Sequence, residues 1–140
     1  MIYRVVISNA KKTFPKRFGL NELLDAERNT KHYDYRMRKS IYKPNKVKKD
    51  GELICQKCIR SQLKGVHISK PIRCTYYIYV PDRTHDKSNT YAGIEKIFLD
   101  SLQNEKVIQN DGFNFVDDSF FHTLVDALNP RVEVEIEEIN

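Results

Sequence analysis

A chain of 140 residues and 16.5 kDa is long enough for one domain with its own hydrophobic core. Its 40% apolar and 31% charged residues are typical of a soluble globular protein and exclude a disordered chain. No apolar run approaches the ~20 residues of a membrane-spanning helix, and the first residues lack a cleavage site, so we expect a cytoplasmic protein with no membrane partner.

The first half of the chain predicts one strand and two helices. Residues 2–7 are rich in β-branched side chains, which favours a strand. A short helix is expected over about 20–27, where Asn21 can cap its start, and a longer one over about 48–63. Between these helices no apolar periodicity is present until about Val47, so we expect a loop or a partly ordered excursion there.

The second half begins with the clearest strand, residues 72–80, in which every second side chain is apolar and both faces carry large side chains. We therefore expect it to be central in a sheet. Three further elements follow it: a helix from about Tyr91 to Leu102, a strand over 113–124 that is broken or bulged near Asp117 and Asp118, and a last strand over 131–139. An Asn-Asp-Gly turn at residues 110–112 separates the helix from the second strand.

This order, β-α-α-β-α-β-β, predicts a single α/β or α+β domain in which helices pack on one mixed sheet. Neither GxxxxGK[ST] nor GxGxxG occurs, so no nucleotide cofactor is expected. The CxxC pair, Cys55 and Cys58, has no second pair at a zinc-ribbon spacing. We interpret these cysteines as part of an apolar helix stripe rather than as a zinc site.

The net charge of +5 is concentrated in the basic segment, which we define as residues 28–49. Nine lysines and arginines, interleaved with tyrosines, face a single acidic residue there, Asp34. This pattern is typical of a protein that binds a phosphate backbone. The candidate DNA-binding residues are Arg28, Lys31, Arg36, Arg38, Lys39, Lys43 and Lys46. The alternative is a flexible, solvated loop without a partner.

The stretch "DKSNTYAGIEKIFLDSLQN" places Asp86, Ser88 and Asn89 just before an amphipathic helix. These residue types are preferred helix caps because their oxygens accept hydrogen bonds from the first free N–H groups. Carboxylates near a lysine on a basic protein are also the residues that a Mg²⁺-dependent nuclease needs. Asp111, or else Asp117 or Asp118, would then have to meet Asp86, and the sequence leaves that choice open.

Most of the chain resembles the RusA family of Holliday-junction resolvases, in its Gram-positive prophage branch. The resemblance is carried by "VPDR", "DKSN", "IEKIFLDSL", "VIQNDG" and "NPRVEVEIEE" in that order, and more loosely by "LNELLDAERN" and "YRMRKS". It implies a homodimer with a mixed sheet that uses Mg²⁺, or Mn²⁺, to nick four-way DNA junctions symmetrically in recombination and repair.

Matched by position, the resemblance implies that Asp86 and Asp111 are metal ligands, and that Lys96 is a lysine required for cleavage. Asn89 matches the asparagine beside the metal site. Ser88 stands where the family has a second aspartate, which removes one anionic ligand. That departure leaves an alternative, a DNA- or junction-binding protein without catalysis. A module that binds an acidic protein partner is a third reading.

Overall fold

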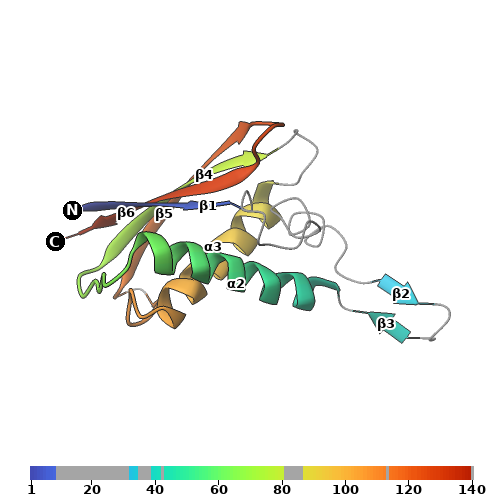
Figure 1. The fold of residues 1–140 in the computed structure, drawn as a ribbon, viewed down its shortest axis with the longest axis horizontal. Helices are drawn as coiled ribbons and strands as arrows, with labels where there is room; N and C mark the ends of the chain where they lie inside the picture. Colours follow the sequence, from blue (N-terminus) through green and yellow to red (C-terminus); the bar gives the residue numbers. More distant parts are fainter. Residues whose placement is uncertain (9–31, 35–38, 42, 81–86, 113, 140) are drawn as a thin grey trace.

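The computed structural model describes residues 1–8, 32–34, 39–41, 43–80, 87–112 and 114–139, with the backbone alone for the described residues in 32–50 and 87–90. Its elements in chain order are β1 (Ile2–Ile7), β2 (His32–Asp34), β3 (Lys39–Ile41), α2 (Lys43–Gln62), β4 (Ile72–Val80), α3 (Lys87–Asn104), β5 (Val116–Val125) and β6 (Arg131–Glu138). The predicted fold class is confirmed, since one small domain combines a mixed sheet with helices (Figure 1).

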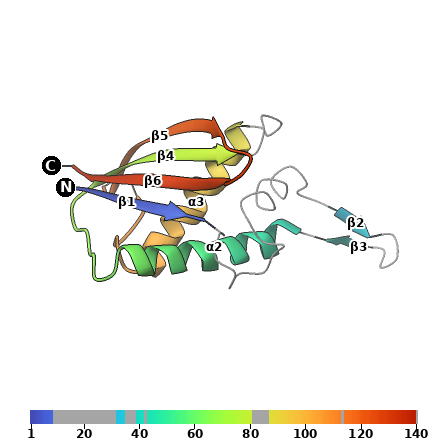
Figure 2. The ribbon, with the colours of Figure 1, turned by 45° about the horizontal axis from the view of Figure 1, so that its top comes forward.

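The main sheet has the strand order β1-β6-β4-β5 (Figure 2). β6 lies between β1 and β4 and is antiparallel to both, whereas β4 and β5 are parallel and α3 forms the crossover between them. A crossover helix must run back across the sheet to bring the chain to the start of a parallel strand. The two ends of α3 therefore lie at opposite ends of the β4–β5 pair.

The core lies between one face of this sheet and the two helices. β4 contributes alternate side chains that are all buried: Ile72, Cys74, Tyr76, Ile78 and Val80. The valines and isoleucine of β6 continue that face, and Ile59 of α2 and Phe98 of α3 cover it with no exposed surface of their own. The period of two in the strands and the apolar stripes of the helices thus produce a single cluster.

The predicted irregularity near Asp117 and Asp118 is confirmed as a β-bulge in β5. Between the partners Ile72↔Val116 and Cys74↔Ser119, β5 contains one residue more than β4. The extra residue breaks the alternation of β5, so that both aspartates are exposed although they are adjacent.

Three predictions for the first half of the chain either are corrected by the structure or concern residues that the structure does not describe. α2 begins at Lys43 rather than near residue 48, because Pro44 in the first turn needs no N–H partner and the lysines that follow are good helix formers. Within the basic segment, β2 and β3 form a two-stranded antiparallel sheet instead of a loop. The helix predicted over 20–27 lies outside the described residues, so the predicted order of elements is not confirmed.

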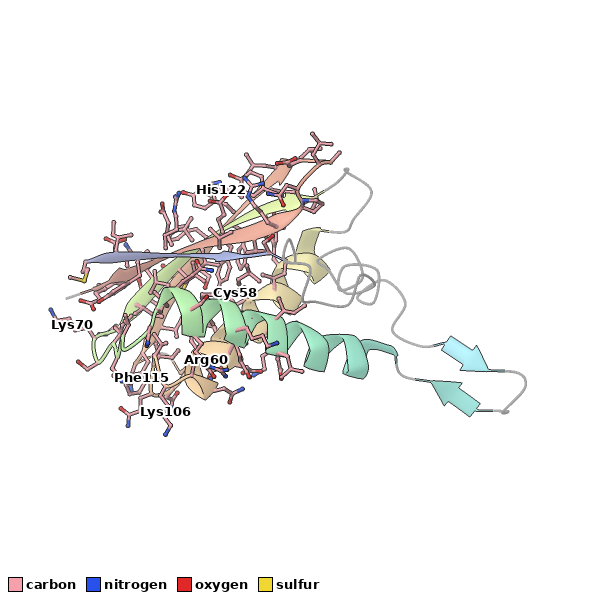
Figure 3. All side chains as sticks on the ribbon, viewed as in Figure 1. Cys58, Arg60, Lys70, Lys106, Phe115 and His122 are labelled. Atoms are coloured by element: carbon pink, nitrogen blue, oxygen red, sulfur yellow. The ribbon has the colours of Figure 1, made fainter. Side chains whose placement is uncertain are left out.

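The interpretation of Cys55 and Cys58 as part of an apolar helix stripe is confirmed for Cys55 and only in part for Cys58. Cys55 of α2 and Cys74 of β4 are buried, whereas Cys58 of α2 is partly exposed (Figure 3). Burial raises the pKa of both the Cys55 and the Cys74 thiol from 9.0 to about 12. These two thiols are therefore neutral at physiological pH and act as small apolar groups.

Candidate functional site

The candidate metal residues at the start of α3 lie at the margin of the described chain. Asp86 is outside the described residues, and Ser88 and Asn89 are described by their backbone, within the first turn of α3. The helix begins at Lys87, directly after Asp86. The position is therefore that of a helix cap by sequence, and the geometry of the Asp86 carboxylate is not part of the description.

Lys96 lies between two carboxylates on the described surface. Its ammonium nitrogen lies 3.1 Å from the carboxylate of Asp100 and 3.9 Å from that of Asp111. The Lys96 side chain is 57% exposed and that of Asp111 36%, so both can be reached by a ligand from solution. We call Lys96, Asp100 and Asp111 the lysine–aspartate cluster.

The loop after α3 brings Asp111 back to the middle of the helix. Lys106 adopts a positive φ of 59°, which turns the chain at the helix end, and Val107 donates a hydrogen bond to the Leu102 carbonyl at 2.9 Å. Val107 and Ile108 are then buried against the core. This anchored loop runs back along the last turns of α3, and so places Asp111 beside Lys96.

The turn that ends this loop agrees with the prediction for residues 110–112. The side-chain oxygen of Asn110 accepts a hydrogen bond from the Gly112 N–H at 2.6 Å, as expected for an Asx turn. A Cβ on Gly112 would lie 3.0 Å from that same oxygen. The turn therefore favours glycine, and it orients the chain on either side of Asp111.

The electrostatics of the lysine–aspartate cluster keep Lys96 charged. A hydrogen bond to Asp100 is the main reason why the pKa of Lys96 is raised, and the charges of Asp100, Asp111 and Glu52 act in the same direction. Glu52 belongs to α2, so the cluster is influenced by both helices. Ammonium and carboxylates neutralise one another here, and this arrangement can stabilise an added negative charge only if Lys96 turns toward it.

The rival aspartates of β5 lie elsewhere. The Asp117 carboxylate accepts a hydrogen bond from the guanidinium of Arg73 at 2.9 Å. Arg73 alternates with the buried side chains of β4 and thus belongs to the sheet face opposite the helices. The structure therefore brings Asp111, and not Asp117, to Lys96.

The spacing along α3 limits how a metal could be shared. Lys96 lies about 13 Å along the helix axis from Lys87, at 1.5 Å per residue. The carboxylate oxygens of Asp100 and Asp111 are the hard donors that Mg²⁺ prefers, but the Lys96 ammonium lies near both and competes with a cation. Within the described residues no group of three His, Cys, Asp or Glu side chains is placed to hold a metal ion. Asp100 and Asp111 are thus two carboxylates beside one ammonium group, and the described residues do not form a complete metal site.

The basic segment is described in part. Lys39 belongs to β3, and Lys43 and Lys46 to the first turns of α2, where the backbone is described. Arg28, Lys31, Arg36 and Arg38 lie outside the described residues. In Figure 1, β2 and β3 lie beyond the N-terminal end of α2, away from the main sheet. Of the basic segment, β2 and β3 therefore lie beyond one end of a 20-residue helix, and residues 43–49 form the first turns of that helix.

Neither described helix contains a stretch long and apolar enough to cross a bilayer.

No family model matches the chain, and no curated protein matches it in sequence. The resemblance to the RusA family therefore depends on the motifs quoted above.

Two acidic residues that influence Lys96, Asp100 and Glu52, were not predicted as site residues. Asp100 had a sequence signal, since it follows Lys96 by four residues on one helix face. Glu52 had none, because its influence on Lys96 depends on how α2 packs against α3.

Proposed function

We propose that the chain is a Mg²⁺-dependent endodeoxyribonuclease of the RusA type, which hydrolyses phosphodiesters in four-way DNA junctions. The observation that carries the proposal is the contact between Lys96 and Asp111, 3.9 Å from nitrogen to oxygen. The resemblance assigns cleavage to these two residues, which are distant in sequence. A shared role in cleavage requires the two side chains to lie close together, and this contact supports it.

The residues divide the chemistry between them. The Asp111 carboxylate would hold the cation, with Asp86 and Asn89 as the further candidates from the start of α3. The Lys96 ammonium would leave Asp100 and bind a non-bridging phosphate oxygen, where it offsets the charge that develops during hydrolysis. A cation held by these residues would supply a Lewis acid, which would polarise the scissile phosphate and activate a water.

The basic segment supports a DNA substrate. Nine cationic side chains face one acidic residue between residues 28 and 49, and each phosphate contact they make would release a counterion. Binding should therefore weaken steeply as salt increases. Tyr33, Tyr35 and Tyr42 could stack on unpaired bases at the centre of a junction.

The test is incubation of the protein with an end-labelled four-way junction in Mg²⁺. We expect symmetric nicks by the wild type, and a loss of about 10²-fold or more in Asp111→Asn. Asp118→Asn is the matched control, because it removes an exposed carboxylate in β5 without touching Lys96. Absence of nicking by the wild type, or equal loss in both variants, would contradict the proposal.

A second candidate function is junction binding without catalysis. It is favoured by Ser88 in place of a metal-binding aspartate and by the competition between Lys96 and a cation. It predicts salt-sensitive junction binding with no nicking in Mg²⁺ or Mn²⁺, and a gain of nicking in Ser88→Asp. Efficient nicking by the wild type would exclude it.

A further inference from the structure

The loop between α2 and β4 contacts the turn that follows α3. Nδ1 of His67 lies 2.7 Å from the carbonyl oxygen of Lys106. The next residue, Ile68, donates its N–H to the carbonyl of Val107, also at 2.7 Å. Because a carbonyl oxygen can only accept, Nδ1 of His67 carries the hydrogen and donates it. We call these two hydrogen bonds the loop clasp, in which two successive residues of one loop hold two successive carbonyls of the other.

The clasp holds the turn at its least favourable residue. Lys106 has a φ of 59° and is the one residue other than glycine with a positive φ in the described part of the chain. Helices commonly end on a glycine in this conformation, because a Cβ makes it unfavourable. The hydrogen bond from His67 fixes the carbonyl of this same residue. Just before it, the Arg60 guanidinium binds the Glu105 carboxylate, with Nε and Oε1 2.7 Å apart. The turn is thus held both from α2 and from the loop that follows α2.

The path of the chain after this turn decides where Asp111 lies. Val107 and Ile108 donate their N–H groups to the Leu102 carbonyl at 2.9 and 3.5 Å, and both are buried. Asp111 follows within the same loop, and its carboxylate lies 3.9 Å from the Lys96 ammonium. That distance is too long for a hydrogen bond, so this contact does not hold the loop in place. The position of the Asp111 carboxylate therefore depends on the turn and on the groups that hold the turn.

We propose that His67 is a positioning residue for phosphodiester cleavage. By donating to the Lys106 carbonyl, it holds the turn after α3 and thereby places the Asp111 carboxylate beside Lys96. This inference rests on the proposed function, which assigns cleavage to Lys96 and Asp111. His67 touches neither the substrate nor the reacting atoms and acts through the loop. A displacement of about 1 Å at a reacting group can cost ~10²-fold in rate, so a hydrogen bond outside the lysine–aspartate cluster can control cleavage.

Substitutions of nearly equal shape separate the hydrogen bond from the other properties of His67. In His67→Asn the side-chain amide offers a donor at the position of Nδ1, whereas in His67→Asp the carboxylate offers acceptors alone. His67→Ala offers neither group and repeats the test without a new charge. Ser69→Ala is the matched control, because Ser69 is an exposed residue of the same loop outside the clasp.

The first measurement locates Asp111 without DNA or metal. It follows the nitrogen chemical shift of the Lys96 ammonium group, which Asp111→Asn changes when the two side chains are neighbours. We expect this change in the wild-type background, in His67→Asn and in Ser69→Ala, and its loss in His67→Asp and His67→Ala. A contribution of His67 to stability alone would leave the folded geometry, and hence the change, intact. No change in the wild-type background, or a full change in His67→Asp and His67→Ala, would overturn the proposal.

The second measurement is junction nicking at a fixed Mg²⁺ concentration. In His67→Asp and His67→Ala, kcat should fall about tenfold or more while the KM for the junction stays within about twofold of the wild type. His67→Asn should retain most of the wild-type kcat. Equal kcat in His67→Asn and His67→Asp would overturn the role of the hydrogen bond in cleavage. A wild type that does not nick junctions would contradict the proposed function instead, and the ammonium shift alone would then decide whether His67 positions Asp111.

Discussion

Lys96 and Asp111 lie 3.9 Å apart, ammonium to carboxylate, although one belongs to the middle of α3 and the other to the loop that follows it. Two kinds of contact produce this approach. The buried side chains of Val107 and Ile108 fix the loop to the core, and the Asx turn at Asn110 directs the chain beyond them. The lysine–aspartate cluster is therefore a product of tertiary packing, and it can be altered without disturbing that packing.

Lys96→Gln should separate activity from stability. Because the Lys96 side chain is mostly exposed, loss of its ion pairs should change the free energy of unfolding by less than about 1 kcal/mol. Loss of a charge that stabilises the transition state should reduce nicking by about 10²-fold. Both quantities are measured on the same preparation, by urea unfolding and by junction cleavage. Lys64→Gln, which removes an exposed lysine beyond α2, is the control, and a similar fall in its activity would refute a specific role for Lys96.

Gln62→Ala should destabilise the protein through the β1 edge. The substitution removes two hydrogen bonds to Val6, and each is worth about 0.5–1.5 kcal/mol. We expect a loss of about 1–2 kcal/mol, since water can replace part of the interaction at this exposed edge. Urea titration followed by circular dichroism measures it. Gln56→Ala, in the same helix, should cost much less, and equal losses would show that the edge contact is not responsible.

Tyr76 offers a substitution that should cost little despite complete burial. Its hydroxyl has no hydrogen-bond partner of ordinary geometry among the described residues and lies close only to the weakly bonding Cys74 thiol; burial, followed by Cys74, raises its pKa well above the ordinary value. Tyr76→Phe should therefore be neutral or stabilise by up to about 1 kcal/mol, because a buried polar group without a partner is removed.

Phe98→Ala serves as the contrast for Tyr76→Phe in the same part of the core. The Phe98 ring meets the Tyr76 ring edge to face, with centroids 5.7 Å apart, and it is fully buried. Its truncation should cost about 3–5 kcal/mol in thermal or urea unfolding. A clear loss of stability in Tyr76→Phe would mean that the hydroxyl has a partner after all.

The two buried thiols predict a loss of stability at high pH. Burial raises the pKa of Cys55 and Cys74 from 9.0 to about 12, so the unfolded chain ionises these thiols at lower pH than the folded chain does. Their contribution is thus complete below about pH 9 and is lost as pH rises toward 12. The difference in unfolding free energy between pH 8 and pH 10.5 should be smaller in Cys74→Val than in the wild type. An unchanged difference would contradict the raised pKa of this thiol.

Local patterns were sufficient for most of the sheet. The alternation of apolar residues in β4 follows directly from the period of a strand, and its five buried side chains match the prediction. The bulge at Asp117 and Asp118 was foreseen because adjacent charged residues interrupt that alternation. The start of α2 was placed too late, since it was sought from apolar periodicity, and the first turns of this helix lack an apolar face.

The candidate site was less accessible to prediction, for physical reasons. The Lys96–Asp100 pair is local, so its spacing shows in the sequence. The contact with Asp111 depends on the path of a loop, and the influence of Glu52 depends on the packing of two helices, so no short pattern encodes either.

The position of β6 has a consequence for how the protein is made. β6 is made after the other described strands, yet it fills the gap between β1, the first of them in the chain, and β4. Until then β1 has no neighbouring strand, and its apolar face stays exposed in the nascent chain. The sheet therefore closes only once β6 has been made, and until then β1 is the segment that a chaperone would have to shield.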